Sequence, residues 1–280
     1  MSLLQILVLA IVQGAAELLP VSSSAHVIVA EKLMGLDPTA PQMTLLLVML
    51  HTGTMFAVIV YFWKSWRATY FSSMPAFRAN AVLIVAATAL TGVVGLILLQ
   101  VIKHVAARNS PDFEIEVLFG DARLMSVALG AAGLLIILSS RAPERARDFT
   151  LRSAAWVGAV QGLCLPFRGF SRSGATISTA LFLGVGRRRA EEFSFALAVV
   201  LTPVVIAKET VRLVKAVGAS ATTASADLLH SFTPSLLGMA LSFLAGLAAL
   251  RWLSRWLEQG HWHWFGVYCV FAAVIVRWIG

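Results

Sequence analysis

The sequence has little charge and few of the residues that build disulfide or zinc sites. Only 13% of its 280 residues are charged, about half the fraction typical of a soluble domain. The two cysteines, Cys164 and Cys269, lie in apolar surroundings, so we expect neither a disulfide nor a zinc site. The first lysine is Lys32, so the N-terminal apolar run lacks the cationic start of a cleavable signal peptide. These absences exclude an ordinary soluble domain.

Hydrophobic residues take the place of the missing charge. They make up 59% of the chain, and the mean hydropathy is +0.83. Apolar runs of about 20 residues, long enough to cross ~30 Å of hydrocarbon, recur along the sequence. The formal net charge of +8 comes mainly from arginines scattered in loops, which is typical of a membrane topology signal. We therefore expect a polytopic protein whose partner is the lipid bilayer and not a nucleic acid.

Eight segments divide into two kinds. Six can span the membrane, or nearly so, at about 43–63, 80–102, 121–140, 193–207 (continuing toward 215), 233–256 and 264–279. Two others, at roughly 3–34 and 153–186, each contain a short apolar run, a polar break and a second short run. A lipid-exposed break would leave backbone groups unpaired at a cost of several kcal/mol each. We therefore predict two re-entrant hairpins of half-helices, shielded by the six spans.

The order of these segments predicts an internal repeat. The stretch AIVQGAAELLPVSSSA from Ala10 resembles GAVQGLCLPFRGFSRSG from Gly158. Three spans per repeat insert the second copy upside down, as described for secondary transporters, although such a fold does not by itself settle function. We expect one all-α membrane domain over 1–280, with repeat one at about 1–140 and repeat two at about 150–280.

Basic residues predict the orientation of the chain. With the N-terminus outside, twelve lysines and arginines fall inside and eight outside, and the acidic segment 109–116 falls outside. The remaining two, Arg168 and Arg172, lie in the second hairpin. In this topology the first hairpin opens to the outside and the second to the inside, and their tips meet near the middle of the membrane.

The polar breaks of both hairpins have the composition of an anion site. The motif GFSRSGATIS places five candidates at the start of a half-helix: Ser171, Arg172, Ser173, Gly174 and Thr176. The first hairpin has a matching set: Ser22, Ser23, Ser24 and His26. A helix N-terminus presents free N–H groups and a partial positive charge, and a guanidinium adds a planar fork of donors. These groups predict a site for a phosphate or a diphosphate.

Some polar residues in these segments have plainer interpretations. Serines before a helix are usually caps, and capping alone can account for the three consecutive serines. A membrane histidine often bonds a backbone carbonyl, which is the role we expect for His51. Glu17 and Arg172 differ, because a charge at membrane depth costs about 2.5–3.5 kcal/mol and needs a functional reason. The alternative is that these two residues pair with each other as an internal strut.

Two motifs carry a resemblance to a known family. Over nearly its whole length the chain resembles the undecaprenyl-diphosphate phosphatases, bacterial membrane enzymes associated with bacitracin resistance. The most specific motifs are ELLPVSSSAH and GFSRSGATIS, backed by FAVIVYFW from Phe56 and EFSFALAV from Glu192. The resemblance implies hydrolysis of a polyprenyl diphosphate, undecaprenyl diphosphate, to the monophosphate, which recycles the lipid carrier for peptidoglycan synthesis. It also implies a multi-pass protein of the bacterial inner membrane with a periplasmic active site.

The resemblance also implies roles for individual residues. The family's catalytic acid, serine, histidine and arginine fall on Glu17, Ser23, His26 and Arg172. Residues expected to contact phosphate are Ser22, Ser24, Ser171, Ser173, Gly174, Thr176 and Arg168. Phosphoryl transfer then depends on positioning and charge stabilisation, with Ser23 as nucleophile and His26, on the same helix face, as its activator. A rival assignment makes His26 the nucleophile.

Two departures from the family pattern affect the expected cofactor. A divalent cation, Mg²⁺ or Ca²⁺, is implied, with Glu17 and Gln13 as candidate ligands. The family commonly has a second glutamate where this chain has Gln13, so the metal requirement stays open. The family commonly has Pro-Gly where this chain has Arg168-Gly169, and we hypothesise that Arg168 replaces part of the metal's charge.

Other functions and assemblies remain open from the sequence. The same scaffold and pocket suit a flippase that moves a polyprenyl phosphate without cleaving it, or, less well, a small-anion transporter. Small residues suit either a homodimer interface or packing within one chain: Gly92, Gly95, Gly130 and Gly133.

Overall fold

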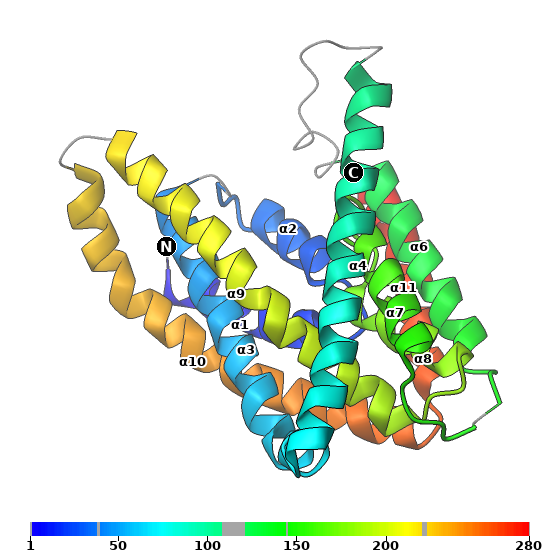
Figure 1. Cartoon of the computed structure of the whole chain (residues 1–280). Helices are drawn as coiled ribbons and strands as arrows, with labels where there is room; N and C mark the ends of the chain where they lie inside the picture. The colour runs from blue at the N-terminus through cyan, green and yellow to red at the C-terminus, as the bar shows by residue number, and fades with distance from the viewer. Residues whose placement is uncertain (1, 38–39, 108–120, 144, 220–222, 280) are drawn as a thin grey trace. The chain divides into compact units, whose positions relative to one another are not determined.

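A computed structural model of the chain consists of helices joined by short connections (Figure 1). It describes residues 2–37, 40–107, 121–143, 145–219 and 223–279, so the acidic segment 109–116 lies outside the described residues. Within those ranges there are ten helices, and strand pairing is limited to one isolated bridge. Their bounds are α1 (Leu3–Leu18), α2 (Ser23–Leu33), α3 (Pro41–Thr69), α4 (Met74–Ala107), α6 (Ala122–Ser139), α7 (Leu151–Leu163), α8 (Arg172–Phe182), α9 (Arg187–Ala219), α10 (Thr223–Glu258) and α11 (Trp262–Ile279).

The helix lengths confirm an all-α, multi-pass membrane protein. Among the described residues, five helices are long and apolar enough to cross a bilayer: α3, α4, α6, α9 and α10. The sixth expected span corresponds to α11, whose described apolar part, Trp262–Trp278, is shorter than the other five. The pattern of two short helices followed by three further helices occurs twice along the described chain.

The short helices come in the two expected pairs, α1 with α2 and α7 with α8. They contain 16, 11, 13 and 11 residues. At 1.5 Å per residue they are roughly 16–24 Å long, less than the ~30 Å of a hydrocarbon core. Each is therefore a half-helix by length, as the sequence predicts.

The helices form two compact units, which we describe separately. Unit 1 comprises Met1–Leu18, His26–Trp63 and Ala198–Leu253. Unit 2 comprises Leu19–Ala25, Lys64–Leu197 and Ser254–Gly280. Each unit takes helices from both halves of the sequence, so neither unit coincides with one predicted repeat.

In unit 1, close backbone approach holds α1 and α3 against α10. A Cβ added to Gly14 would lie 2.7 Å from both the Ser242 carbonyl oxygen and the Ala245 Cβ. Gly53 of α3 likewise faces the Met239 carbonyl, with no room for a methyl group. The Ser242 hydroxyl donates to the Leu50 carbonyl at 3.1 Å. These contacts fix the helix that carries Gln13 and Glu17.

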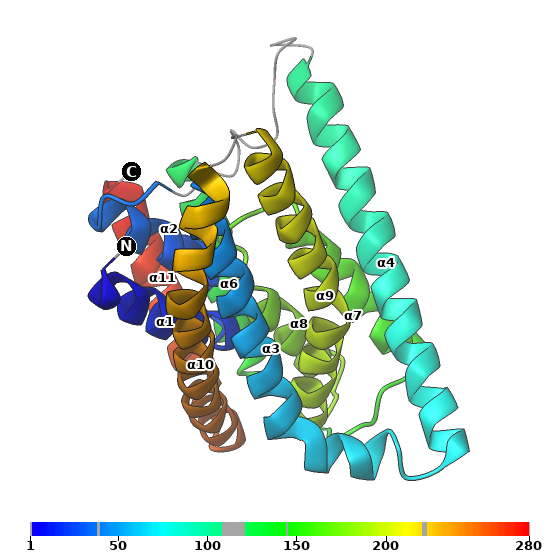
Figure 2. The ribbon, with the colours of Figure 1, turned by 90° about the vertical axis from the view of Figure 1, so that its left-hand side faces the viewer.

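In unit 2, α7 lies alongside α4 (Figure 2). A Cβ on Gly158 would meet the Ala87 backbone, and one on Gly162 would lie 2.8 Å from the Val94 Cβ. The Gln161 amide donates to the Thr91 hydroxyl at 3.1 Å, and that hydroxyl donates to the Gly158 carbonyl at 2.9 Å. Buried hydrogen bonds and glycine contacts therefore fix the first half of the second hairpin.

Also in unit 2, α6 packs along α11, which is drawn in red behind the green α6 in Figure 1. A Cβ on Gly133 would lie 2.7 Å from the Gly266 carbonyl oxygen, and a Cβ on Gly266 2.6 Å from that of Gly133. Gly95 contacts Leu165, and a Cβ on Gly130 would be 3.7 Å from Ala273. Three of the four glycines considered for a dimer interface thus serve packing within the chain, and the homodimer stays a prediction.

A buried carboxylate organises the start of α9. The Glu192 side chain, 2% exposed, accepts from the Ser65 hydroxyl, from Arg188 Nε at 3.1 Å and from Arg189 Nη1 at 3.4 Å. The same Arg189 donates from Nε to Asp148 Oδ1 at 2.9 Å. Because two guanidiniums and a hydroxyl compensate the buried charge, the network ties α9 to the end of α3 and to the loop before α7.

Candidate active site

The start of α8 is built around a serine cap. Ser171 has an extended backbone (φ −60°, ψ 116°), and its hydroxyl accepts from the Gly174 N–H at 3.2 Å. The first N–H groups of a helix have no intrahelical partner, so this cap satisfies one and leaves the end of α8 suited to an anion. Arg172 is half-buried at the first helical position. The predicted arginine therefore occupies an N-terminal helix position.

Two glycines shape the approach to α8. Gly169 has φ +101°, and a Cβ there would lie 2.5 Å from the Met125 carbonyl oxygen. Gly174 is buried, and a Cβ there would lie 2.9 Å from Ile136 Cδ1 and 3.1 Å from the Ser171 hydroxyl. Both positions require glycine for close packing, and Gly169 also for its backbone conformation. The exposed Arg168 lies in the same tight connection.

The remaining hydroxyls of this motif are buried and have protein partners. Thr176 is 0% exposed; its hydroxyl donates to the Arg172 carbonyl at 2.8 Å and lies 2.6 Å from the Ser194 hydroxyl. Ser171 is the cap, and the buried Ser173 hydroxyl donates to the Leu19 carbonyl at 3.3 Å. These contacts give Ser171, Ser173 and Thr176 structural roles, and their part in phosphate binding stays a prediction.

The break of the first hairpin belongs to unit 2 and lies at this end of α8, because Ser173 donates to the Leu19 carbonyl. Besides the Ser173–Leu19 bond, the Cys269 thiol of α11 contacts the Pro20 carbonyl at 3.1 Å. The Val21 N–H closes a tight turn onto the Leu19 carbonyl at 2.8 Å. The structure thus brings together the serine-rich break of the first hairpin and the N-terminus of α8.

Strain is stored within this serine-rich break. Ser22 has φ +67°, a conformation that costs a non-glycine residue about 1–3 kcal/mol. Its hydroxyl lies 3.3 Å from that of Ser24. Ser23 begins α2 and is half-buried, and His26, also half-buried, lies one turn further along the same helix. Strained residues concentrate at functional sites, so this break is a candidate for the reacting centre.

The acidic part of the predicted site lies in unit 1, on α1. Gln13 is 2% exposed, and its Nε2 donates to Glu17 Oε2 at 3.4 Å. The two residues are four positions apart and therefore share one helix face. The Gln13 amide thus contacts the Glu17 carboxylate directly.

The candidate residues divide between the units as follows. Unit 1 contains Gln13, Glu17 and His26; unit 2 contains Ser22, Ser23, Ser24, Arg168, Ser171, Arg172, Ser173, Gly174 and Thr176. Neither unit contains both Glu17 and Arg172, so the strut between them stays a prediction. The expected structural role of His51 is confirmed, because its Nδ1 lies 2.8 Å from the Leu47 carbonyl oxygen.

The described residues offer at most two side chains of the predicted site to a metal ion. Among them, no group of three or more His, Cys, Asp or Glu side chains is placed to hold an ion. Mg²⁺ is commonly held by one or two carboxylates together with substrate phosphates and water. The pair of Glu17 and Gln13 fits that mode of binding and does not form an all-protein cage.

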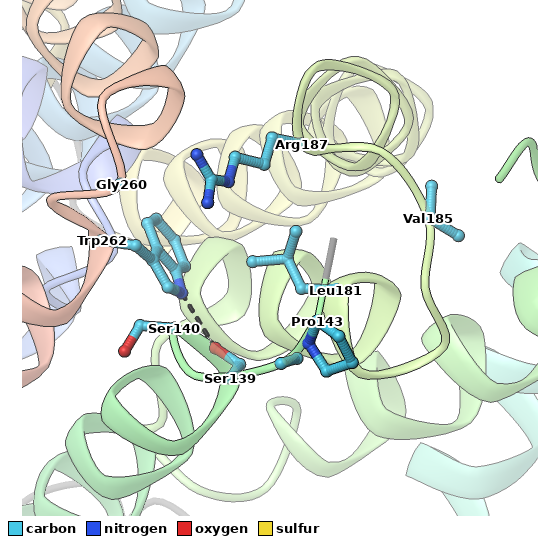
Figure 3. A pocket seen from close by; sticks show the side chains of 9 residues that line it. Ser139, Ser140, Pro143, Leu181, Val185, Arg187, Gly260 and Trp262 are labelled. Carbon is cyan, nitrogen blue, oxygen red and sulfur yellow. Dashed lines mark hydrogen bonds between the residues drawn. The ribbon is translucent and has the colours of Figure 1, made fainter. Parts of the chain in front are cut away.

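A small cavity in unit 2 lies at the opposite end of α8, roughly 16 Å from its N-terminus. Its volume is about 20 Å³, room for one water molecule. Figure 3 shows Ser139 and Trp262 joined by a 3.0 Å hydrogen bond on one side, with Arg187 reaching over from the start of α9. The cavity is too small for a diphosphate and is separate from the predicted site.

Comparison with known proteins identifies the family. Residues 6–275 match the family model described as Bacitracin resistance protein BacA. The chain belongs to the BacA family. It is 61% identical to Undecaprenyl-diphosphatase 2 of Acinetobacter baylyi, over 99% of this chain and 98% of the relative. It is 34% identical to Undecaprenyl-diphosphatase 2 of Burkholderia orbicola (98% and 95% covered) and 33% identical to Undecaprenyl-diphosphatase of Gluconacetobacter diazotrophicus (98% and 96%).

Membership of the BacA family confirms the resemblance drawn from the two hairpin motifs, both of which lie within the matched residues. Two residues that contact the site were not predicted from the sequence to do so. Ser194, the partner of Thr176, lies in the supporting motif EFSFALAV, whose role the sequence does not reveal. Cys269 is a lone cysteine in an apolar helix, and nothing in the sequence predicts its contact with Pro20.

Proposed function

We propose that this BacA-family chain hydrolyses undecaprenyl diphosphate to undecaprenyl phosphate and inorganic phosphate. The observation that carries this function is 61% identity, over nearly the whole of both chains, to a protein named undecaprenyl-diphosphatase. The reaction recycles the lipid carrier for peptidoglycan synthesis and fits a family described by bacitracin resistance. The chain acts as a multi-pass protein of the bacterial inner membrane; the family resemblance implies an active site that faces the periplasm, and the distribution of basic residues places the N-terminus on that side.

The second hairpin supplies the positive charge of the reaction. Arg172 and the N-terminal N–H groups of α8 hold the terminal phosphoryl group and the charge that develops as the P–O bond breaks. The Ser171 cap and the close packing of Gly174 support this role, because they fix the backbone direction at the helix start. Arg168, exposed in the same connection, adds a second positive charge for the diphosphate.

The first hairpin supplies the nucleophile and the proton transfer. The Ser23 hydroxyl attacks the terminal phosphorus and loses its proton to His26, while the P–O bond to the lipid monophosphate breaks. Water then hydrolyses the phosphoserine, returning the serine and releasing inorganic phosphate. The rival path uses a His26 nitrogen as nucleophile. A phosphate adduct that survives acid indicates Ser23, and an acid-labile adduct indicates His26.

Glu17 orients the histidine, acts as a base or binds a cation. The hydrogen bond from Gln13 supports these roles, because the donor helps to fix the position of the carboxylate. A bound divalent cation, Mg²⁺ or Ca²⁺, neutralises diphosphate charge; Glu17 with Gln13 would hold it. The requirement is weaker than in relatives with two acids if Arg168 supplies part of that charge.

We propose further that the two halves of the chain are inverted repeats. Reciprocal packing supports this arrangement: Gln13-Gly14 of α1 packs on α10, and Gln161-Gly162 of α7 packs on α4. Each first half-helix thus contacts the second long helix of the other half. The mutual contact of Gly133 and Gly266 is also what a two-fold axis between α6 and α11 would produce.

The decisive test is phosphate release by the purified protein in detergent. We expect Ser23→Ala and Arg172→Ala to reduce turnover of an isoprenyl diphosphate by at least about 100-fold. Matched controls at exposed positions, Ser72→Ala in the turn between α3 and α4 and Arg78→Ala near the start of α4, should keep normal rates. Release that is untouched by both active-site changes contradicts the proposal. Lipid movement across vesicles without phosphate release favours the flippase that the inverted repeats also suit.

A further inference from the structure

A second hollow of unit 2 lies beside the cavity of Figure 3, with which it shares Ala142 and Pro143. It has a volume of about 270 Å³ and is open to the surface. Two arginines and two apolar side chains line it: Arg141, Arg145, Leu138 and Phe182. We call it the basic hollow. It lies at the end of α8 away from Arg172, so the catalytic proposal does not use it.

Residues 145–147, which supply Arg145 to this hollow, are held in a fixed and strained shape. The Arg147 N–H donates to the Gly184 carbonyl at 3.0 Å, and the Gly186 N–H donates to the Arg147 carbonyl at 3.1 Å. Ala146 has φ +47°, a conformation that is costly for a residue with a Cβ. Gly184 has φ +78°, and the Arg145 Cδ lies 3.1 Å from where its Cβ would be. The loop is thus pinned with the Arg145 side chain packed over Gly184.

The electrostatics of this loop favour an anion. In sequence, residues 141–147 contain three arginines and one acid. The following acid, Asp148, is already paired with Arg189 at 2.9 Å. Burial alone would raise the pKa of Asp148, but the hydrogen bond and charge of Arg189 outweigh it and lower the pKa. The C-terminal ends of α6 and α8 also lie here, and free carbonyls at a helix C-terminus would favour a cation. The N–H groups of Ser140 and Leu183 bond carbonyls in the last turns of these helices, which reduces that effect.

The other half of the basic hollow is apolar and faces outward. Leu138 is 54% exposed and Phe182 is 48% exposed. Leu134, one turn before Leu138 on the same face of α6, is 57% exposed. The spanning part of α6 ends at Ser139 and that of α9 begins at Arg187, so the hollow lies where membrane helices end. That level is occupied by lipid headgroups, with acyl chains beside the adjacent helix surface.

We propose that the basic hollow binds an anionic phospholipid of the surrounding leaflet. Arg141 and Arg145 bind the phosphate diester, and an acyl chain lies along Leu134 and Leu138. A free phosphate would use only the arginines and leave the exposed leucines and Phe182 uncovered. Basic pockets between membrane helices recognise anionic headgroups in this way. The site is independent of the phosphatase reaction and can be tested whether or not that reaction is confirmed.

The test is native mass spectrometry of the full-length protein titrated with phosphatidylglycerol or phosphatidylcholine of identical acyl chains. We expect phosphatidylglycerol to bind at least about tenfold more tightly, and Arg141→Gln/Arg145→Gln to weaken it by roughly 30-fold. The matched control is Arg251→Gln/Arg255→Gln, which removes the same charge from exposed positions on α10 and should bind as wild type. Helical circular dichroism and phosphate release should be unchanged in both variants.

Four outcomes would overturn the proposal. Equal affinity for the two lipids removes the anionic preference. An equal loss in the double variant and its control shows general attraction to a basic surface. Displacement of phosphatidylglycerol by undecaprenyl phosphate at much lower concentration assigns the hollow to a polyprenyl phosphate, and displacement by millimolar inorganic phosphate assigns it to a free anion. If the double variant does not fold, Arg141→Gln alone makes the same comparison with Arg251→Gln.

Discussion

The two hairpins share a sequence pattern but differ in their charged residues. Each begins with a half-helix that contains a buried Gln-Gly pair. In the first hairpin the glutamine donates to Glu17; in the second, Gln161 donates to Thr91, and the position equivalent to Glu17 is Leu165. The serine motifs differ in the same way, since Arg172 stands where the first hairpin has Ser23. If the proposed repeat is correct, the comparison teaches that the two hairpins share a Gln-Gly half-helix and differ in which of them carries an acid and which an arginine.

The largest effect should come from removing the acid on one side of this comparison. We expect Glu17→Gln to lower phosphate release by about 1,000-fold or more, because the reaction loses its carboxylate base or cation ligand. Leu165→Gln changes the equivalent position of the second hairpin and should cost less than about threefold. Similar losses in both variants would show that the hairpins do not divide the chemistry.

The arginine is the second point of divergence. Arg172→Ser recreates the three consecutive serines of the first hairpin, and we expect about a 100-fold loss in kcat/KM because the planar charge clamp disappears. Arg172→Lys keeps the charge without the fork and should recover only part of the rate. The measurement is steady-state phosphate release over a range of isoprenyl diphosphate concentrations, and full recovery by lysine would contradict bidentate recognition.

Gly169, the first residue of the motif GFSRSGATIS, tests how the scaffold holds Arg172. Gly169→Ala should destabilise the protein by about 2–3 kcal/mol, because alanine is strained at φ +101° and would collide with the Met125 carbonyl. Gly92→Ala is the control, since a Cβ there meets nothing within 4 Å. The measurement is the midpoint of thermal unfolding, followed as loss of phosphate-release activity after heating. Equal midpoints for Gly169→Ala and Gly92→Ala would refute the packing argument.

A smaller effect is expected where the first hairpin departs from its family. Gln13→Glu restores a second carboxylate beside Glu17, and we expect roughly tenfold stronger dependence of activity on Mg²⁺. Rates measured across a Mg²⁺ titration, with EDTA as zero point, test this expectation. An unchanged titration curve would mean that Gln13 is not near a cation in the working enzyme.

The smallest effect concerns the ion pair between Asp148 and Arg189. Because its folded pKa is lowered, the Asp148 carboxylate adds stability above its unfolded pKa of 3.8, and this contribution is lost as pH falls through the lower folded value. Asp148 is largely exposed, so Asp148→Asn should cost about 1 kcal/mol or less. Unfolding midpoints at pH 7 and pH 3 should differ less in the variant than in the wild type.

Most of the helical framework was predictable because membrane burial leaves a strong signal. Hydrophobic run length separated spans from half-helices, and Pro20 and the serines marked the break after Glu17. The span expected over 264–279 corresponds to α11, whose described apolar part, Trp262–Trp278, is shorter than the other five spans. Length near the threshold depends on where a helix stops, which hydropathy defines poorly.

Side-chain partnerships were less predictable, because they depend on packing between distant segments. The sequence does not predict that the Thr176 hydroxyl lies 2.6 Å from the Ser194 hydroxyl, 18 residues further along the chain. The left-handed backbone at Ser22 and Ala146 has no sequence signal, since neither residue favours it. His51 was predictable because its partner, the Leu47 carbonyl, lies one helical turn away.

The crossing of α6 and α11 restricts how this chain can change over time. A methyl group on either Gly133 or Gly266 would collide with the carbonyl oxygen of the other glycine. A larger residue at either position would push the two helices apart, and a change at the other position could not make room for it. We therefore expect both glycines to be among the slowest-evolving residues of the protein, although neither belongs to the proposed catalytic site.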